Sequence, residues 1–414
     1  MATIGPSSWE LDKLQSIFDS GADVFRLNYS HGEPEDKTDL YKKIRSLETG
    51  GKTTCILADL PGPKLRLGEF KGVRLLKNGE EIRLLCGKKK HDGTELPVEY
   101  DGLSAELNVG DSVLLADGLI RLSVSATGQE KSSFVDCIVE DGGPLTSRKG
   151  INVPGTMVDL PAIGEKDKAA LSHALEQGAD WVAVSYVRSA DDIKPAKEAI
   201  KAAGLHTPII AKIEHPAALK NLHSILDAAD AVMVARGDLG VEIPLEQVPL
   251  AQQKIIDAGL MRGMVVIVAT QMLESMTLNP RPTRAEVSDV STAIRHGGTA
   301  VMLSGETASG DHPISAVQTM VKIATATEDG LMSSGVTPGA LSKFRSTRAV
   351  AHAGVELARL SDAQHILVAT QHGNAPRLVS GYRPGANIIA VTDRIRAARR
   401  LNLIPGVKSV MVEE

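Results

Sequence analysis

The sequence predicts an α/β protein built around a parallel (β/α)8 barrel, the TIM-barrel fold, and three observations lead to this expectation. Eight short runs rich in β-branched residues are bounded by turn signals, as buried parallel strands are. Amphipathic helical stretches separate most of these runs. Several runs end in polar or charged residues, and barrel enzymes keep their chemistry at the carboxyl ends of their strands. We therefore expect an enzyme whose site lies at one end of the barrel.

The expected barrel strands are spread from the first residues of the chain to about residue 306. They are Ala2–Ile4, Val24–Ser30, Thr54–Leu60, Trp181–Val187, Pro208–Glu214, Ala231–Asp238, Val265–Gln271 and Ala300–Glu306. The helices expected between them include Lys166–Gln177, Ala190–Ala203, Ala217–Ala228 and Leu245–Arg262. An open doubly wound sheet is the alternative, but it usually carries a glycine-rich fingerprint after its first strand, and none is present. Because few residues precede Thr3, we expect an open barrel edge at the first strand.

The stretch between the third and the fourth expected strands has a different character. Over residues 63–158, apolar and polar residues alternate, and Asn-Gly or Asp-Gly pairs mark turns. This pattern is typical of an antiparallel, β-barrel-like domain. A domain inserted at the carboxyl end of a barrel can close over a site as a lid. We therefore expect the barrel from residues 1–62 and 159–331, and the lid from residues 63–158.

Three more strand patterns alternate with helices after a linker rich in Ser, Gly and Pro at Met332–Ser342. They predict a small C-terminal α/β domain over residues 343–414. A sheet of three strands leaves an edge exposed, so we expect this domain to be truncated or its edge to be covered by a partner.

Composition excludes several classes of partner. The net charge is −5 and no block of like charges occurs, which argues against nucleic acid or an anionic membrane as the main partner. The three cysteines are widely spaced and form no Cys-x-x-Cys pair, which favours neither a disulfide framework nor a zinc site. No basic region followed by an apolar stretch marks a signal peptide, and no apolar run approaches the roughly 20 residues of a membrane helix. We expect a cytoplasmic protein.

The clearest chemistry comes from Glu214, Asp238 and Lys212, near the ends of two successive strands. Two carboxylates are too few for a calcium site but suit Mg²⁺, which keeps waters and takes further ligands from substrate. Lys212 lies two residues before Glu214, so both side chains point the same way from the strand. Beside a metal, a lysine can stabilise negative charge on a group in transfer. The alternatives are surface carboxylates balanced by basic neighbours, and a Schiff-base lysine.

Arg26, Asn28 and Ser30 share one face of the second strand, as the alternation of side chains requires. Polar groups in this position suggest a bound phosphate or cation, and the alternative is a set of satisfied core polar groups. His31 follows them and is, by itself, more often structural than a base.

Backbone and hydroxyl groups at other strand ends are further candidates. Gly237 and Asp238 open a short helix, whose free amides could bind a carboxylate or a phosphate. Thr270 and Ser304 end two strands, where a hydroxyl could pass on a proton through water or bind a carboxylate. Either hydroxyl could equally cap the helix that follows it.

Taken together and in order, ten motifs resemble those of the pyruvate kinase family. They are Thr3-Ile-Gly-Pro6, Arg26-Leu-Asn-Tyr-Ser-His-Gly32, Ala58-Asp-Leu-Pro-Gly-Pro-Lys-Leu-Arg66, Lys149-Gly-Ile-Asn-Val-Pro-Gly155, Asp159-Leu-Pro-Ala162, Ala211-Lys-Ile-Glu214, Arg236-Gly-Asp-Leu-Gly240, Ala269-Thr-Gln-Met-Leu273, Asn279-Pro-Arg-Pro-Thr-Arg-Ala-Glu286 and Met302-Leu-Ser-Gly-Glu-Thr-Ala308. The resemblance runs from residue 2 to the last residue. It implies a barrel interrupted by a β lid and followed by an α/β domain.

The resemblance also implies an activity, the last step of glycolysis, in which phosphoenolpyruvate and ADP give pyruvate and ATP. It implies Mg²⁺ or Mn²⁺ at Glu214 and Asp238, and a family assembly that is a homotetramer. The catalytic residues that it implies are Lys212, Thr270 and Arg26. The substrate contacts that it implies are Arg26, Gly237, Asp238 and Thr270. The nucleotide contacts that it implies are Arg66, Lys149, His31 and Asn28.

A potassium pocket is implied at Asn28, Ser30, Asp59 and the carbonyl of Leu60. Lys64 stands where potassium-dependent members of the family carry glutamate and potassium-independent members carry lysine. A fixed ammonium can replace the potassium charge, so we expect that K⁺ is not required. The alternative is that Lys64 points into solvent and the pocket still fills.

Two other functions remain open from the residues. One is a metal-dependent lyase or aldolase that acts on a pyruvate enolate, which needs the metal ligands but not Arg66 and Lys149. The other is an inactive or weakly active truncated paralogue with a regulatory or binding role. Retention of Lys212, Asp238 and Thr270 argues against this second alternative.

Overall fold

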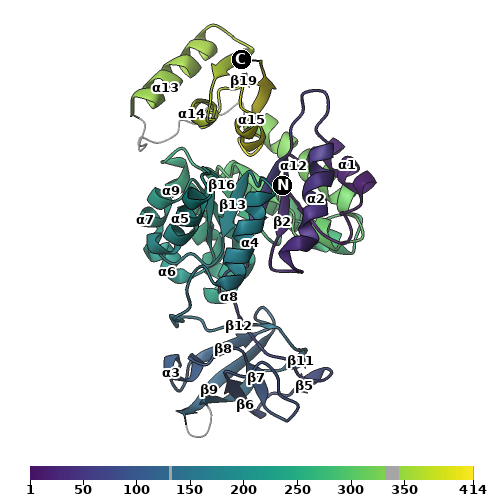
Figure 1. The fold of residues 1–414 in the computed structure, drawn as a ribbon, viewed down its shortest axis with the longest axis vertical. Coiled ribbons are helices and arrows are strands. Elements are labelled where there is room, and N and C mark those ends of the chain that lie inside the picture. The colour runs from purple at the N-terminus through teal and green to yellow at the C-terminus, as the bar shows by residue number, and fades with distance from the viewer. Residues whose placement is uncertain (130–132, 332–344, 414) are drawn as a thin grey trace.

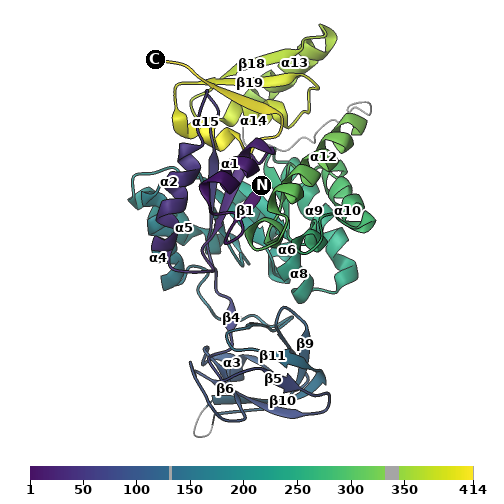
Figure 2. The same ribbon diagram turned by 90° about the vertical axis from the view of Figure 1, so that its right-hand side faces the viewer.

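The computed structural model describes residues 1–129, 133–331 and 345–413. Three units follow one another along its long axis, with the inserted lid at one end, the barrel in the middle and the C-terminal unit at the other end (Figures 1 and 2). The linker expected at Met332–Ser342 lies outside the described residues. The domain boundaries expected from the sequence stay a prediction.

Eight parallel strands form the barrel sheet, so the predicted fold class is confirmed. In spatial order they are β1 (Ala2–Ile4), β2 (Val24–Asn28), β3 (Cys55–Asp59), β13 (Trp181–Val184), β14 (Ile209–Ile213), β15 (Ala231–Ala235), β16 (Val265–Ala269) and β17 (Ala300–Met302). The strands end earlier than the sequence pattern suggested. As a result, Glu214, Asp238 and Thr270 lie just beyond the strand ends, on backbone that is no longer tied into the sheet.

The seam between β1 and β17 is closed by a small number of bonds. β1 pairs with β2 from Ala2 to Ile4 on one side. On the other side, Ala2 forms a parallel bridge with Leu303, and the Thr3 amide donates to the Leu303 carbonyl at 3.1 Å. The Leu303 amide in turn donates to the Met1 carbonyl at 3.0 Å. The open edge expected at the first strand is therefore wrong, because even a very short strand supplies the backbone groups that the seam needs.

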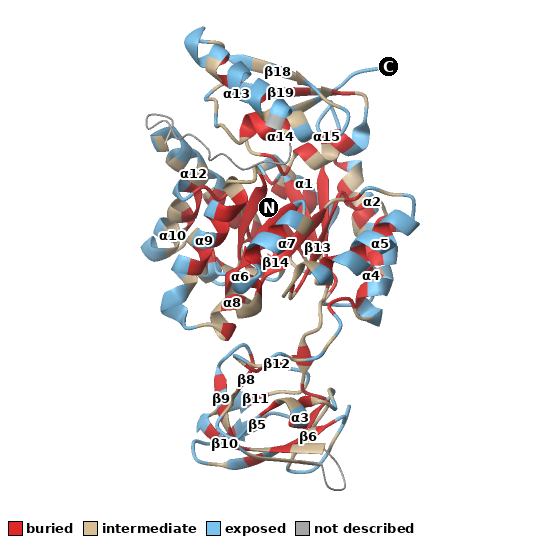
Figure 3. Ribbon diagram, turned by 90° about the vertical axis from the view of Figure 1, so that its left-hand side faces the viewer, coloured by how far each residue is buried: buried red, intermediate tan, exposed pale blue. Residues whose placement is uncertain are grey.

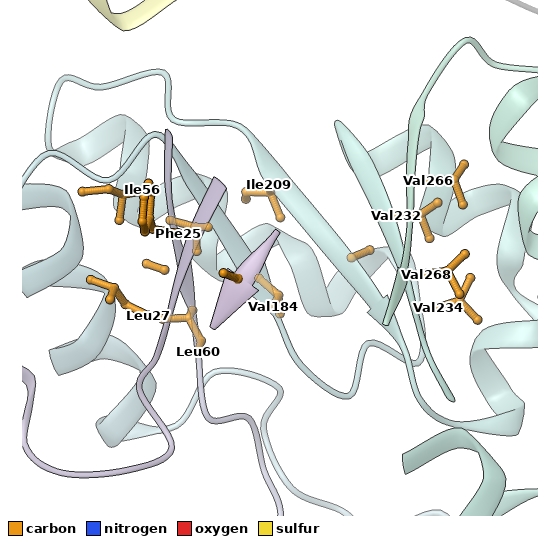
Figure 4. Close-up of a cluster of buried hydrophobic side chains, with 14 of the residues drawn as sticks. Phe25, Leu27, Ile56, Leu60, Val184, Ile209, Val232, Val234, Val266 and Val268 are labelled. Carbon is orange, nitrogen blue, oxygen red and sulfur yellow. The ribbon is translucent and has the colours of Figure 1, made fainter. Parts of the chain in front are cut away.

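Two apolar layers hold the barrel together. One layer lies between the strands and the surrounding helices, where Phe25, Ile56, Val232 and Val266 point outward from their strands (Figure 4). Burial is concentrated in these strands and in the inner faces of the helices (Figure 3). Residues in register with Trp181 form the second layer, inside the barrel at its amino-terminal end. Continuous apolar runs are thus buried on both faces, as expected of parallel strands.

The described residues of the barrel form eleven α-helices. They are α1 (Leu11–Asp19), α2 (Thr38–Ser46), α4 (Glu165–Glu176), α5 (Lys194–Ala202), α6 (Pro216–Lys220), α7 (Leu222–Ala228), α8 (Arg236–Glu242), α9 (Val248–Leu260), α10 (Arg284–Arg295), α11 (Gly305–Ala308) and α12 (Pro313–Leu331). The single helix expected at Ala217–Ala228 is in fact two helices that meet at Asn221.

The lid contains two sheets and one short helix, α3 (Leu103–Glu106). The larger sheet consists, in spatial order, of β4 (Leu65–Arg66), β12 (Gly150–Asn152), β8 (Ser112–Leu115), β9 (Ile120–Gln129), β10 (Ser133–Asp141), β6 (Glu81–Cys86) and β7 (Leu96–Val98). The smaller sheet pairs β5 (Arg74–Leu76) with β11 (Gly143–Leu145). The pairings are antiparallel as predicted, except that β6 and β7 run parallel. β4 and β12 are neighbours at the end of the lid that joins the barrel, where Figure 1 labels β12 and Figure 2 labels β4.

The C-terminal unit is a three-stranded parallel sheet with helices, as predicted. Its elements are α13 (Arg345–Leu360), β18 (His365–Ala369), α14 (Asn374–Ser380), β19 (Asn387–Thr392), α15 (Ile395–Leu401) and β20 (Val407–Met411). Leu401 and Ile404 pack into the apolar layer inside the barrel, and Arg399 forms an ion pair with Glu48 at 2.6 Å. The C-terminal unit therefore covers the amino-terminal end of the barrel. No helix in the described parts of the chain has the length and apolar character needed to cross a membrane.

Candidate functional site

Charged and polar side chains gather inside the carboxyl end of the barrel. Residues that alternate with the outward-facing apolar ones on β2, β3 and β14 point inward, and near the strand ends these are Arg26, Asp59 and Lys212. Glu214 and Ser185 lie just past two strand ends and join them. All five side chains belong to buried residues, with exposed fractions of 8% or less. The barrel interior is thus apolar at one end and charged at the other.

Lys212 is the centre of this group. Its Nζ lies 3.0 Å from Glu214 Oε1 and 3.2 Å from Asp59 Oδ1, and it donates to Ser185 Oγ at 2.8 Å. Burial alone would lower the pKa of Lys212, but Asp59 and Glu214 raise it above the usual lysine value. The side chain is therefore an ammonium held in one position, which does not suit a Schiff-base lysine that must lose its proton.

Arg26 binds the second carboxylate oxygen of Asp59, Oδ2. Its Nε donates to Asp59 Oδ2 at 2.7 Å, and its Nη2 lies 2.6 Å from the same oxygen. Burial would raise the pKa of Asp59, but Lys212 and Arg26 lower it below the usual value. Asp59 is therefore an ionised carboxylate between two cations, and Arg26 is held at the wall of the site by a fixed partner.

Asp238 connects the barrel to the lid. Its Oδ1 accepts hydrogen bonds from Lys64 Nζ at 2.9 Å and from the Tyr186 hydroxyl at 2.8 Å. Lys64 Nζ also donates to Asp117 Oδ1, on the lid, at 3.0 Å. Burial would raise the pKa of Asp238, but Lys64 and Lys212 lower it. Asp238 is thus an ionised carboxylate whose second oxygen has no hydrogen-bond donor among the described residues.

Glu214 is the second carboxylate near this point. The Tyr186 amide donates to Glu214 Oε2 at 2.6 Å. Burial raises the pKa of Glu214, Lys212 opposes this effect, and Asp238 raises the pKa further. The two carboxylates therefore repel each other, which a cation between them would relieve.

Thr270 lies on strained backbone directly after β16. Its φ is +68°, a left-handed conformation that β-branched residues rarely adopt. The carbonyls of Thr270 and Gln271 accept hydrogen bonds from Arg236 Nη2, at 2.8 and 2.9 Å. The Gly237 amide donates to Thr270 Oγ1 at 2.7 Å. The expectation that this amide is free is therefore wrong in this structure, because a neighbouring hydroxyl has taken it.

A cleft of about 1150 Å³ opens beside these groups, between the barrel and the lid. Its lining includes the predicted site residues Arg26, Asn28, His31, Gly237, Asp238 and Thr270, together with Lys64 and Asp117. The other predicted site residues are absent from the described lining, namely Ser30, Asp59, Leu60, Arg66, Lys149, Lys212 and Glu214. Arg66 still lies near His31, since its charge, together with burial, lowers the pKa of that imidazole. Lys149 is exposed on the lid, where its neighbours Arg148 and Gly150 contact Arg66 through a hydrogen bond and strand pairing.

The residues of the predicted potassium pocket are engaged with one another and with the barrel. Asn28 Oδ1 accepts from the Ser30 amide at 3.0 Å, and the Leu60 carbonyl accepts from Ser185 Oγ at 2.7 Å. Lys64 binds Asp238 and Asp117, and no hydrogen bond in the described structure joins it to the pocket residues. Its side chain is 19% exposed, so it does not point into solvent either.

Ser304 and Thr270 are also expected, from the sequence, to be possible caps of the helices that follow them. Ser304 lies at the amino-terminal boundary of α11, but its hydroxyl makes no capping hydrogen bond. Its Oγ is buried without a hydrogen-bond partner in the described structure, and the residue lines the cleft. Thr270 does not cap the helix that follows it, because its hydroxyl accepts from the Gly237 amide at the start of α8 and donates to the Ala269 carbonyl.

Three residues at the site escaped the sequence analysis. Ser185 shares the inward face of β13, and alternation from Trp181 could have identified it. Tyr186 had no such signal, because its side chain reaches Asp238 only through a left-handed backbone with φ +53°. Asp117 belongs to a turn of the lid, and its distance in sequence from Lys64 concealed their ion pair.

We predict that Asp117→Ala makes the lid more mobile. The substitution removes the carboxylate in the lid turn that binds Lys64. This ion pair is partly exposed and contributes about 0.2–1 kcal/mol. Hydrogen–deuterium exchange should become faster in the two segments that join lid and barrel, near residues 62–66 and 149–158. Asp136→Ala is the matched control, because it removes the Arg83 ion pair inside the lid. Equal exchange in wild type and Asp117→Ala would contradict the role of this ion pair.

Comparison with known proteins agrees with this arrangement. Residues 1–317 match the family model described as pyruvate kinase, barrel domain, and residues 348–414 match the model described as pyruvate kinase, alpha/beta domain. Pyruvate kinase from Geobacillus stearothermophilus is 42% identical over 416 residues, covering 98% of this chain and 70% of the relative. Pyruvate kinase from Mycobacterium tuberculosis (strain ATCC 25618 / H37Rv) is 39% identical over 415 residues, covering 100% of this chain and 87% of the relative. With both models matched and this identity sustained along its length, the chain belongs to the pyruvate kinase family.

Proposed function

We propose that this protein transfers the phosphoryl group of phosphoenolpyruvate to ADP, giving pyruvate and ATP. In this reaction the bond between phosphorus and the enol oxygen breaks, and a new bond forms to a terminal oxygen of ADP. The enolate that remains takes a proton at carbon and becomes pyruvate. Phosphoryl transfer depends on positioning and on neutralising charge, so the site must supply cations around the moving group.

The observation that carries this proposal is the position of Lys212. It is a buried ammonium at the wall of the site, fixed by two carboxylates and a hydroxyl. A cation held in advance stabilises charge that develops during the reaction without a cost for reorganisation. Arg26 lines the adjacent cleft and is fixed by Asp59, so it is ready to contact the phosphate of the bound substrate.

The carboxylates fit a divalent metal that requires few protein ligands. Among the described residues, no group of three or more acidic, His or Cys side chains could hold a metal. Glu214 and Asp238 would supply two oxygen ligands, and Mg²⁺ or Mn²⁺ typically completes its shell with water and substrate oxygens. When bound, the ion would neutralise charge on the transferring phosphoryl group. The mutual repulsion of Glu214 and Asp238 supports this assignment.

The substrate carboxylate is proposed to bind at Thr270 and at the amides that begin α8. In the structure, the Gly237 amide donates to Thr270 Oγ1. The carboxylate of the substrate would therefore replace the Thr270 hydroxyl as the acceptor of this hydrogen bond. We propose that a water or hydroxyl near Thr270 delivers the proton to the enolate. Arg66, Lys149, His31 and Asn28 are proposed to contact the nucleotide, with Lys149 reaching the cleft only when the lid moves.

An assay coupled to lactate dehydrogenase tests the reaction directly. Pyruvate should form from phosphoenolpyruvate only when ADP and Mg²⁺ are both present. A lyase or aldolase would form pyruvate from another substrate without ADP, and an inactive paralogue would form none. Turnover that does not depend on ADP would refute the proposal.

We predict that Lys212→Met lowers kcat by about 10² to 10³ or more, because the missing charge is needed as the phosphoryl group moves. Lys254→Met is the matched control, since that lysine binds only a backbone carbonyl on an exposed helix surface. The substitution leaves Asp59 and Glu214 less compensated, so the melting temperature should be compared as a check on folding. A folded variant that keeps more than about a tenth of the wild-type rate would show that the role of Lys212 is wrong.

The proposed reaction is expected not to require potassium. Asp59, in the implied pocket, already has Arg26 and Lys212 on its two oxygens, and Lys64 adds a third cation beside Asp238. Activity with about 100 mM KCl should match activity with an equal amount of tetramethylammonium chloride. Stimulation by K⁺ of about tenfold or more would contradict this expectation. Lys64→Glu should create a potassium requirement, because it removes the fixed ammonium.

We also propose that the protein forms a homo-oligomer in a reducing cytosol. Leu250 is 72% exposed in the first turn of α9, which suits contact with another copy. The cysteines at positions 55, 86 and 137 are buried and free, which suits a reducing compartment. Light scattering of the purified protein measures its mass, and a monomer at micromolar concentration would refute the assembly.

A further inference from the structure

Tyr186 contacts both of the carboxylates that are proposed to hold a divalent metal. Its backbone amide donates to Glu214 Oε2 at 2.6 Å, and its hydroxyl donates to Asp238 Oδ1 at 2.8 Å. Glu214 follows β14 and Asp238 lies in α8, so the two carboxylates come from different segments of the chain. A residue that donates to both can set how they lie relative to each other.

The backbone of Tyr186 adopts an uncommon conformation at this point. Its φ is +53°, in the left-handed region, which a bulky aromatic residue rarely adopts. Such a conformation persists only where the surrounding contacts impose it, and it is most frequent at functional sites. In this conformation one residue directs its amide to Glu214 and its hydroxyl to Asp238. The strain therefore coincides with the contacts to the proposed metal ligands.

Packing fixes the ring of Tyr186 in addition to its hydrogen bond. The ring lies against Gly62, where an added Cβ would be 3.1 Å from Tyr186 Cδ2 and 2.6 Å from Ser185 Cβ. Gly62 has a φ of +73°, so this close approach occurs at a position that favours glycine. The Gly62 amide donates to Asp167 Oδ1 at 2.8 Å, which holds this segment in place. A ring fixed in this way delivers its hydroxyl to one position.

The two donors to Asp238 Oδ1 belong to different parts of the protein. Lys64 donates to this oxygen at 2.9 Å and also binds Asp117 in the lid at 3.0 Å. Tyr186 belongs to the barrel, where it follows β13. A movement of the lid can therefore change the contact of Lys64, whereas the contact of Tyr186 does not depend on the lid.

We propose that Tyr186 is a positioning residue for the divalent metal and orients Asp238 so that Oδ2 is available as a ligand. This inference rests on the proposed function, in which Glu214 and Asp238 hold Mg²⁺ or Mn²⁺. Because Tyr186 and Lys64 both bind Oδ1, the carboxylate cannot rotate without losing two hydrogen bonds. Partners that orient a metal ligand in this way typically contribute about 10- to 100-fold to metal affinity.

Binding of Mn²⁺ without substrate or nucleotide tests this proposal, with free Mn²⁺ measured by electron paramagnetic resonance. Tyr186→Phe keeps the ring and the amide but removes the hydroxyl, so the Kd should rise by about tenfold or more. A residue with only a packing role would leave the Kd unchanged. Tyr100→Phe is the matched control, because it removes a hydroxyl that donates to Glu106 within the lid at 2.5 Å. Melting curves show whether each variant is folded.

Asp238→Asn separates this proposal from the assignment of the metal itself. If wild type shows no saturable binding of Mn²⁺, or if Asp238→Asn binds it as tightly as wild type, the metal assignment is wrong and the proposal with it. If Asp238→Asn loses affinity but folded Tyr186→Phe does not, only the role of Tyr186 is wrong. An equal loss of affinity in Tyr100→Phe would also overturn that role.

A second measurement uses wild type alone and decides the test if Tyr186→Phe does not fold. The chain has five tyrosines, which can be labelled with ¹³C at Cζ. Addition of Mg²⁺ should shift one of these signals in the NMR spectrum, because the Tyr186 hydroxyl is bonded to a proposed metal ligand. Tyrosine signals that all stay unchanged at saturating Mg²⁺ would contradict the proposal.

Discussion

A buried, alternating set of four charges is the constraint on which the rest of the site depends. Arg26, Asp59, Lys212 and Glu214 come from neighbouring parts of the barrel interior and sum to zero charge. Each is buried, so removal of one partner would leave an uncompensated charge, at a cost of about 3–5 kcal/mol. The same pairing holds Lys212 as an ammonium in a fixed position. Stability and catalytic preorganisation therefore come from the same contacts.

The lid is tied to this charged end through two carboxylates of α8, Asp238 and Glu242, of which Glu242 accepts from Asn152 on the lid at 2.7 Å. Asp238 accepts from Tyr186 on the barrel and from Lys64, which also binds Asp117 on the lid. A metal held by Asp238 and a movement of the lid would therefore act on the same carboxylate. The Lys64–Asp117 ion pair can therefore influence the site although it contributes little to stability. The strained backbone at Tyr186 and Thr270 lies at the same end of the barrel.

The two ends of the barrel have opposite chemistry for a common reason. Along β2, β3 and β14 the inward-facing residues change from apolar to charged, so one end of the barrel excludes water and the other binds polar ligands. The apolar end is covered by the C-terminal unit, through Leu401 and the Arg399–Glu48 ion pair.

The sequence by itself determined the barrel, the inserted lid and several of the residues that line the cleft. Periodicity identifies buried parallel strands, and alternation alone places Lys212 and Glu214 on one face. Only the tertiary structure decided which groups pair, because pairing depends on distances between segments far apart in sequence. It brought Asp117 to Lys64 and Tyr186 to Asp238, and it used the Gly237 amide within the protein. The closed seam likewise depends on where Leu303 lies in space, since backbone hydrogen bonds leave no mark in the sequence.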